Sequence, residues 1–565
     1  MVGSSSASDA SAAVESKTIA EQVRAGYAED DEGIQMTEGA VAHRWQGTAA
    51  DKKDMSQLGR VQELRVCAAS KYKGAAELWL TRREQRNFQF MSILGFGCTL
   101  IATWEVLVTT LLTSLTDGGT AGLLWGFIIV TIGFSFVYLS IAEMASMAPT
   151  SGGQYHWVSE FAPKPAQKFL SYIVGWLCFT GWQCAITSIT FLAGTIIQGL
   201  IVLSNPDTYV AQPWQGTLLI IAITCFAIFF NTVLSKKLPL VEGLLLVLHV
   251  LGAFAIIITL WVLAPTADAK TVWTEFTNAG AWNSDGTATM VGLLSPIISM
   301  IGFDCVVHMS EEVKDAGSTL PKALLWSVAF NAALGFLMAV TLCFCLGDVT
   351  SILSTATGYP FIQVFYNVTH SYAGASVMTS ILILTLTSAA IAEVATASRQ
   401  LWSFARDKGV PGYRWLSKIT PGSNIPLNAV LVSLTVTSLL SLINIGSTAA
   451  LNAILALTTC SLLASYMIVI SCVLIKRMRG RPLPDSHFSL GRWGIPVNIL
   501  ALCYLAPVFV FSFFPAATPV TPSTMNWAIV MFTGIMGFAT IYYVAVGHKH
   551  YVPPVALVMR DIYEQ

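Results

Sequence analysis

The positions of the lysines and arginines along this chain indicate what kind of protein it is. Of the nineteen Lys and Arg residues after Arg86, eighteen lie in every second loop between long apolar runs, and the exception is Lys270. Each apolar run is long enough to cross a hydrocarbon core of about 30 Å. Because positive residues mark the cytoplasmic side of a membrane protein, the pattern predicts an all-α integral membrane protein with twelve transmembrane helices and both termini in the cytoplasm.

The composition agrees with this class. The chain is 54% hydrophobic and 11% charged, whereas soluble domains contain about 25% charged residues. Most of the eleven cysteines lie inside apolar runs and lack metal-ligand spacing. We therefore expect no disulfide framework, no metal and no cofactor. The sequence also lacks an ATP-binding domain and the nucleophile–base set of a membrane enzyme, so we expect neither an enzyme nor a nucleic-acid partner.

The chain divides into three parts. Residues 1–80 form a polar, largely disordered cytoplasmic tail without the pattern of a signal peptide, in which the stretch 55–80 is compatible with a short surface helix. Residues 81–547 form the twelve-span domain, and residues 548–565 form a short cytoplasmic tail. The expected spans are 88–114, 121–147, 167–202, 214–234, 241–263, 289–311, 321–347, 375–405, 427–446, 448–475, 495–514 and 524–547.

Two spans are predicted to be broken. The first contains two glycines, a threonine and a carboxylate at membrane depth, and the sixth contains a proline, a glycine, a carboxylate and a histidine. These residues are Gly95, Gly97, Thr103, Glu105, Pro296, Gly302, Asp304 and His308. A carboxylate at mid-membrane costs at least about 2.5 kcal/mol, so it should face a cavity or a partner. Broken helices in corresponding positions of two halves indicate a transporter site.

Four motifs resemble a known family: GGTAGLLWGF at 118–127, EMASMAPTSGGQYHW at 143–157, IGFDCVVHMSEEVKDAGSTLPKA at 301–323, and ASRQLWSFARDKGVPGYRWLSKITPGSNIPLNAVL at 397–431. They are similar to amino acid–polyamine–organocation permeases, above all to the fungal GABA and choline branch, over about residues 80–545. The resemblance implies a leucine-transporter-like fold, with two inverted five-helix repeats (spans 1–5 and 6–10), two peripheral spans and alternating access.

The sequence departs from the family pattern at two places. Thr120 stands where relatives often have proline. Thr103, Trp104 and Glu105 stand where many relatives carry Gly-Ser-Gly, which binds a substrate carboxylate. A carboxylate at that position repels an ordinary amino-acid carboxylate and favours a cationic group.

The resemblance places the substrate site at the two breaks and on the third span. The implied substrate-binding residues are Thr103, Trp104, Glu105, Trp182, Gln183, Ser299, Ile301, Gly302, Phe303 and Asp304. An aromatic face such as that of Trp182 can bind an ammonium group by cation–π attraction. Packing is the alternative role for this tryptophan.

Four ionisable residues are candidates for proton coupling, each with an alternative. Glu105 is a counter-ion or proton carrier, unless it lies near the outer interface. Asp304 is a gating carboxylate or a helix N-cap. His308 titrates near neutral pH, or makes a structural hydrogen bond. Glu393 is a further candidate on span 8, while His249 should face the bundle.

Two further predictions concern the ends of the bundle. Arg86, just before span 1, and Asp407, just after span 8, are expected to form an ion pair of the cytoplasmic gate, unless the arginine only fixes topology. On the outer side, the stretch 347–374 can hold a short helix. It contains the glycosylation sequon at Asn367, which is either modified or a chance match.

These observations predict a secondary active transporter, with proton-coupled symport favoured over sodium coupling. Its expected partners are a small amine-containing solute (an amino acid, GABA or choline), protons and the lipid bilayer. The alternative is a membrane nutrient sensor that binds solute without transporting it. The plasma membrane is the expected location, with the vacuolar membrane as the alternative. The sequence leaves the oligomeric state open.

Overall fold

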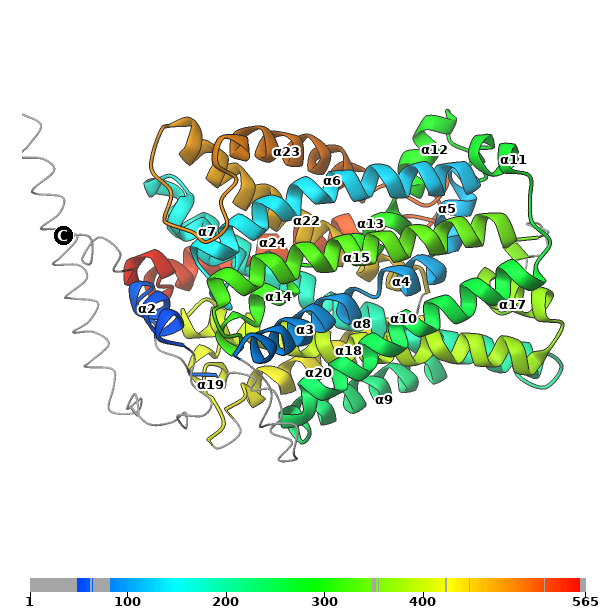
Figure 1. The fold of residues 1–565 in the computed structure, drawn as a ribbon, viewed down its shortest axis with the longest axis horizontal. Helices are drawn as coiled ribbons and strands as arrows, with labels where there is room; N and C mark the ends of the chain where they lie inside the picture. Colours follow the sequence, from blue (N-terminus) through cyan, green and yellow to red (C-terminus); the bar gives the residue numbers. More distant parts are fainter. Residues whose placement is uncertain are drawn as a thin grey trace, which may run out of the picture.

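The computed structural model describes residues 48–60, 63–64, 82–347, 352–353, 355–421, 424–446, 448–522 and 524–558. This part of the chain is helical, and the β-structure within it is one isolated bridge between Asp117 and Asn278. The long helices lie side by side along one axis of the molecule (Figure 1). The predicted all-helical architecture is therefore confirmed.

Within the described ranges, twelve helical segments are long and apolar enough to cross a membrane, as predicted. They are Phe90–Thr109, Gly119–Met147, Lys164–Ser204, Pro213–Thr232, Leu240–Leu263, Asp285–His308, Ala316–Cys345, Tyr372–Arg406, Leu427–Gly446, Ala453–Met478, Gly491–Phe511 and Ala528–Leu557. We number them spans 1 to 12. Each span coincides with an apolar run of the sequence. These runs are helical because lipid offers no hydrogen-bond partners, and a helix pairs the backbone groups with one another.

The spans correspond to the following helices. Span 1 contains α3 (Arg82–Ile101) and α4 (Thr103–Thr109), and spans 2 to 5 are α6 (Gly119–Met147), α8 (Gln167–Ser204), α9 (Pro213–Thr232) and α10 (Leu238–Leu263). Span 6 contains α12 (Asp285–Gly292), α13 (Leu294–Met300) and α14 (Cys305–His308). Spans 7 to 10 are α15 (Ala316–Cys345), α18 (Tyr372–Arg406), α20 (Leu427–Ser441) with α21 (Ile443–Gly446), and α22 (Thr448–Met478). Spans 11 and 12 contain α23 (Gly494–Phe511) and α24 (Ala528–Tyr542).

Spans 1 and 6 are interrupted where the sequence predicts breaks. Span 1 breaks at Ala102, whose φ of 46° is left-handed. Span 6 unwinds between Met300 and Cys305, where Gly302 has a φ of 101°. Such angles end a right-handed helix and cost a non-glycine residue free energy. The two breaks occupy corresponding positions, because span 1 is the first of spans 1–5 and span 6 is the first of spans 6–10.

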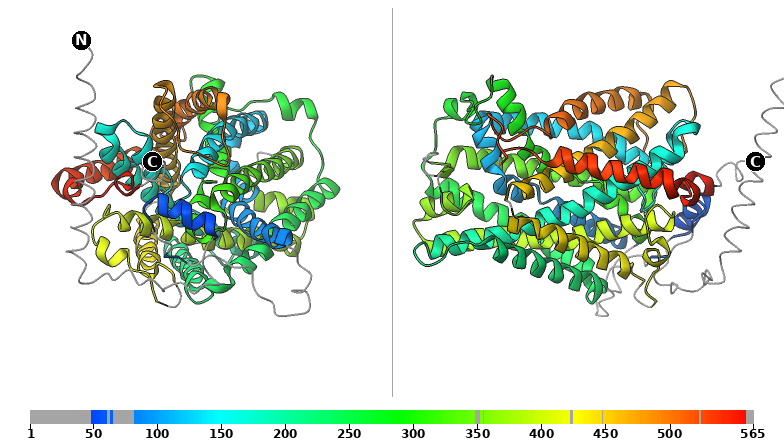
Figure 2. Two further views of the ribbon diagram at one scale, coloured as in Figure 1. Left: turned by 60° about the vertical axis from the view of Figure 1, so that its left-hand side comes forward. Right: turned by 180° about the vertical axis from the view of Figure 1, so that it is seen from behind.

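The two long helices α8 and α18 pack against each other, and α22 packs against α8. The apolar stretches of spans 1, 6 and 10 are 83% buried inside the protein, whereas that of span 12 is only 6% buried. Figure 2 shows α24, in red, along the outside of the bundle. Spans 1, 6 and 10 are therefore central and span 12 is peripheral.

The two ends of the bundle differ in charge and in the short helices they carry. One end carries α2 (Ala49–Gln57), α7 (Gln154–Phe161) and α19 (Tyr413–Leu416) (Figure 1). The lysines and arginines of alternate loops lie there, and we call it the basic end. The opposite end carries α5 (Leu111–Thr116), α11 (Ala269–Thr274) and α17 (Pro360–Thr369). Helix α17 lies in the stretch where the sequence allows a short outer helix.

The N-terminal tail contributes one ordered segment. Helix α2 begins six residues before the stretch in which a surface helix was expected, and most of that stretch lies outside the described residues. Leu58 and Leu64, which follow α2, are 1% and 0% exposed and belong to the main hydrophobic core. This part of the tail is therefore packed against the bundle. The expected disorder in the first half of the tail also lies outside the described residues.

Candidate substrate site

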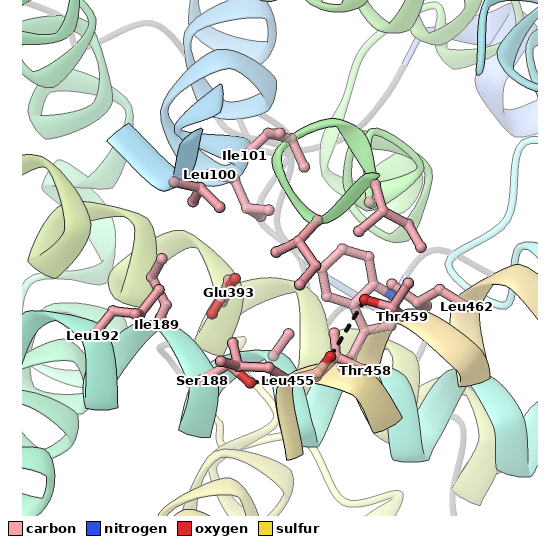
Figure 3. Close-up of a pocket in the computed structure, with 16 residues that line it drawn as sticks. Leu100, Ile101, Ser188, Ile189, Leu192, Glu393, Leu455, Thr458, Thr459 and Leu462 are labelled. Atoms are coloured by element: carbon pink, nitrogen blue, oxygen red, sulfur yellow. Dashed lines mark hydrogen bonds between the residues drawn. The ribbon is translucent and has the colours of Figure 1, made fainter. Parts of the chain in front are cut away.

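A cavity of about 60 Å³ lies at the two helix breaks. Span 1 contributes Leu100, Ile101 and Val106 to its wall, and span 6 contributes Ile298, Ile301 and Gly302. Spans 3, 8 and 10 complete the wall with Trp182, Ala185, Ser188, Ile189, Leu192, Glu393, Leu455, Thr458, Thr459 and Leu462 (Figure 3). A mainly apolar enclosure with a few polar groups is typical of a small-molecule site.

Glu393 is the one ionisable residue among those that line the cavity. It projects from α18 and is 7% exposed, and in Figure 3 it lies among the labelled side chains of the other walls. Its Oε2 atom has no hydrogen-bond partner in the described part of the chain. Because an unpaired buried charge is very unfavourable, this carboxyl group needs either a proton or a cationic ligand.

Trp182 and His308 connect the cavity wall to the basic end. The Trp182 indole Nε1 donates to His308 Nε2 at 3.1 Å, and His308 Nδ1 lies 2.8 Å from the carbonyl oxygen of Ser151. An indole can only donate and a carbonyl can only accept, so the ring hydrogen is on Nδ1 and Nε2 is the acceptor. Both ring nitrogens of His308 are therefore engaged in hydrogen bonds within the protein. This arrangement favours its structural interpretation.

Asp304 lies just beyond the break, on the side of the basic end. Its carboxylate accepts hydrogen bonds from Gln154 Nε2 of α7 and from the hydroxyl of Tyr466 on α22. His308 Nε2 is 3.5 Å away. The Asp304 side chain makes no capping bond to α14. It therefore joins span 6 to α7 and span 10. Sequence reasoning identified neither Gln154 nor Tyr466, since their roles depend on contacts more than 140 positions apart.

Tyr138 of α6 satisfies the backbone that the break in span 6 leaves free. Its hydroxyl accepts hydrogen bonds from the amides of Gly302 at 3.0 Å and Phe303 at 3.4 Å, and donates to the carbonyl of Met300 at 2.8 Å. Buried backbone groups need such partners. The ring of Phe303 packs against Tyr138, with centroids 5.4 Å apart. Nothing in the sequence distinguishes this tyrosine from the other fifteen.

The three predicted residues at the break of span 1 are buried but do not line the cavity. Glu105 Oε1 lies 2.7 Å from His249 Nδ1 on α10, and the Trp104 indole donates to the backbone carbonyl of His249 at 3.2 Å. Thr103 packs against Gly335 of α15, because a Cβ added to Gly335 would lie 2.8 Å from the Thr103 methyl group. Glu105 is thus the partner of a histidine on span 5.

A second carboxyl group lies on α10, two helical turns before His249. Thr99 Oγ1 is 2.7 Å from Glu242 Oε2 and 2.9 Å from the carbonyl oxygen of Gly95. The threonine hydroxyl is the donor to both acceptors and shares its one hydrogen between them. The contact between spans 1 and 5 therefore contains three buried titratable side chains outside the cavity wall, Glu105, His249 and Glu242.

Two other predicted site residues have hydrogen-bond partners within the protein. Ser299 Oγ donates to the carbonyl of Pro296 at 2.9 Å, and Gln183 Nε2 donates to Ser433 Oγ on α20 at 3.0 Å. Of the ten residues that the resemblance implies, Trp182, Ile301 and Gly302 line the cavity. Asn367 lies on α17 at the opposite end, and its Oδ1 accepts from Gln363 at 2.8 Å. Modification of Asn367 stays a prediction.

Asp407 lies at the basic end and has two side-chain partners. One is Arg60 of the N-terminal tail, and the other is the hydroxyl of Tyr155 at 2.9 Å. Burial, and secondly the charge of Asp407, raises the pKa of Tyr155 well above its usual value, so the hydroxyl remains a donor. The side chain of Arg86, the expected partner of Asp407, lies outside the described part of the chain.

Three further ion pairs join helices at the basic end. Arg399 and Arg406 of α18 pair with Glu312 and Glu311 at the end of span 6, both at 2.8 Å. Arg477 of α22 pairs with Glu143 of α6. The loop before α7 packs closely against span 6, because a Cβ on Gly153 would lie 3.2 Å from His308. The cavity is therefore separated from the basic end by several layers of polar contacts.

Comparison with known proteins adds an independent observation. A family model described as amino acid permease matches residues 88–536. The choline transporter of Saccharomyces cerevisiae is 29% identical over 469 residues, which cover 83% of this chain and 82% of the yeast protein. Amino-acid permease 2 of Neurospora crassa is 27% identical over 479 residues, covering 83% and 86%. An uncharacterized amino-acid permease of Schizosaccharomyces pombe is 27% identical over 474 residues, covering 83% and 87%.

Proposed function

The chain belongs to the amino acid permease family, and on this premise we propose that it is a proton-coupled symporter of a small amine-containing solute. An amino acid, GABA and choline are the candidate solutes. The observation that carries the proposal is the cavity between the two helix breaks, into which Glu393 brings a carboxyl group without a hydrogen-bond partner on Oε2. The names of the relatives, a choline transporter and amino-acid permeases, agree with this class of solute.

The chemistry of the cavity favours a cationic group over an anionic one. Glu393 supplies the counter-charge, Trp182 supplies aromatic surface for cation–π attraction, and aliphatic side chains supply the remaining contacts. Among the residues that the structure describes, no Lys, Arg or His lines the cavity to pair with a substrate carboxylate. We therefore place the amine of the solute at Glu393, and not at Glu105, which His249 occupies.

We place proton coupling first at Glu105 and His249. The pair lies on the broken span 1 and on span 5, and Glu105 Oε2 and His249 Nε2 have no partner in the described part of the chain. A rotation of α4 would separate the carboxylate from the imidazole, and each group could then gain or lose a proton. Glu393 is the second proton-binding candidate, because it holds a proton whenever the cavity contains no cation. Asp304 is a gating carboxylate in this scheme, and His308 makes a structural hydrogen bond, with proton coupling as the alternative role of both residues.

The experiment that tests the function is uptake of labelled choline, GABA and lysine into proteoliposomes with an inward proton gradient. We expect accumulation of at least one of these solutes, and we expect an uncoupler to abolish it. Accumulation that ignores the proton gradient but follows sodium would refute the coupling. Measurable binding without any uptake would instead identify a non-transporting sensor. We propose the plasma membrane as the location, with the basic end and both termini in the cytoplasm.

A further inference from the structure

We propose that residues 48–60, together with Glu63 and Leu64, form a latch that holds the basic end of the bundle closed and is released whenever the protein opens toward that end. The inference rests on the proposed transport function, which requires such an opening. The segment binds the bundle at two separate anchors, one on α15 and one on α18, with buried leucines next to the second.

The first anchor is Asp51 of α2. Its Oδ1 accepts a hydrogen bond from the amide of Ala316 at 3.0 Å, and its Oδ2 accepts one from the amide of Asp315 at 3.0 Å. The first amides of a helix have no partner within the helix, and a carboxylate at that end is favoured by the helix dipole. Asp51 therefore caps α15 from a segment 264 positions away in the sequence.

The second anchor is Arg60, which forms an ion pair with Asp407 at the end of α18. The two side chains are 7% and 1% exposed. Breaking a buried pair leaves an uncompensated charge, so each partner strongly holds the other in place. Glu63 also lies 3.6 Å from Arg406, but its side chain is 42% exposed and contributes less.

Apolar contacts fix the segment beside these anchors. Leu58 and Leu64 belong to the main hydrophobic core of the bundle. Gly59 has a φ of 65°, and an added Cβ would lie 1.9 Å from the backbone oxygen of Leu557. Only glycine fits there, and the contact brings the C-terminal segment against the tail. The segment is therefore seated within the basic end and is not a loose surface peptide.

The positions of the anchors explain why this contact controls opening. The cavity lies between spans 1 and 6 on one side and spans 3, 8 and 10 on the other. A path from the cavity to the basic end must separate span 6, which leads directly into α15, from α18. Asp51 and Arg60 are joined by helix α2 and a tight turn, which cannot stretch. Widening the gap between α15 and α18 therefore breaks one anchor.

The test measures access to the cavity and does not depend on transport. A cysteine reporter is introduced by Ser188→Cys in the cavity wall, and the protein is placed in sealed vesicles with the basic end facing a membrane-impermeant maleimide. The same chain without the reporter gives the background from native cysteines. We expect Arg60→Gln and Asp51→Ala each to accelerate labelling of the reporter severalfold. Arg60→Lys, which retains the ion pair, and Lys53→Gln on the exposed face of α2 should label at the unmodified rate.

Two results would overturn the latch. One is an unchanged labelling rate in both Arg60→Gln and Asp51→Ala, measured on protein that elutes as a single species in size exclusion. The other is equal acceleration by Lys53→Gln, which would indicate general loosening of the tail. Failure of the transport function has a different signature, because solute uptake would be absent while the anchor variants still accelerated labelling.

Discussion

Two buried carboxyl groups of the membrane-spanning helices, Glu393 and Glu105, have opposite surroundings. Glu393 lines the cavity, whereas Glu105 lies against His249 and does not line it. In the proposed function, Glu393 binds the solute, and Glu105 is the first candidate for proton coupling. Each proposed role can be tested with a single substitution.

Removal of the charge of Glu393 should weaken the binding of a cationic solute. Glu393→Gln keeps the size of the side chain, and we expect a loss of about 1–3 kcal/mol in binding free energy, the scale of one hydrogen bond to a charged group. Calorimetry with the transported solute measures it. Glu275→Gln, which removes the same charge from an exposed position, is the matched control. Equal affinities for the two variants would rule out Glu393 as the counter-ion.

Replacement of Glu105 should alter the coupling of transport more than solute binding. We expect Glu105→Gln to bind solute with near-normal affinity but to lose accumulation driven by a pH gradient, because the pair with His249 can no longer exchange a proton. His249→Gln should have the same effect. The double variant should be no worse than either single one, as expected for residues that act as a unit. If the losses of accumulation in the double variant were additive, Glu105 and His249 would act independently.

At the scale of elements, the break in span 6 is the feature that shapes the cavity. The break depends on the positive φ of Gly302 and on the Tyr138 hydroxyl, which accepts hydrogen bonds from the backbone amides that the break leaves unpaired. A helix that continued through this point would fill the cavity with its own backbone. The break is thus part of the cavity wall, to which it contributes Ile301 and Gly302.

A side chain at Gly302 should damage the site without unfolding the protein. An added Cβ would lie 3.2 Å from Ile101 and 3.4 Å from Trp182, and the left-handed φ costs a non-glycine residue about 1–2 kcal/mol. We expect Gly302→Ala to reduce solute affinity at least tenfold. Gly534→Ala in α24, where an added Cβ meets nothing within 4 Å, is the control. Solute titrations of both variants measure the effect, and normal affinity in Gly302→Ala would contradict the role of the break.

The sequence predicted the two breaks but not the orientation of the residues that follow them. Gly, Pro and ionisable residues interrupt otherwise apolar runs, and this local signal is sufficient to place a break. The direction in which Glu105 points depends on the rotation of α4 after Ala102 and on His249, which is 144 positions away. The docking of Arg60 was likewise hidden, since the polar composition of the tail is typical of disorder.

At the scale of the whole molecule, burial sets one span apart and charge distinguishes the two ends. Span 12 is 6% buried, whereas span 11, at 33%, is buried as much as spans 5 and 9. In the proposed topology the basic end faces the cytoplasm. The direction inferred from the charge pattern can be tested without knowledge of the solute.

Cysteines placed at the two ends should differ in their access from outside the cell. Val210 is 74% exposed at the opposite end, and Met478 is 69% exposed at the basic end. We expect an impermeant maleimide to label Val210→Cys in intact cells and to label Met478→Cys only after permeabilisation. Labelling of Met478→Cys in intact cells, and of Val210→Cys only after permeabilisation, would contradict the proposed topology.

The contact between Gly59 and Leu557 has a practical consequence for work on this protein. It means that the N-terminal segment and residue 557 meet at the basic end. If the proposed latch operates, trimming the first 64 residues, or fusing a fluorescent protein directly after Leu557, would alter the opening that the experiment is meant to observe. The loop around Val210 lies at the other end of the bundle and offers a place for an epitope away from both tails.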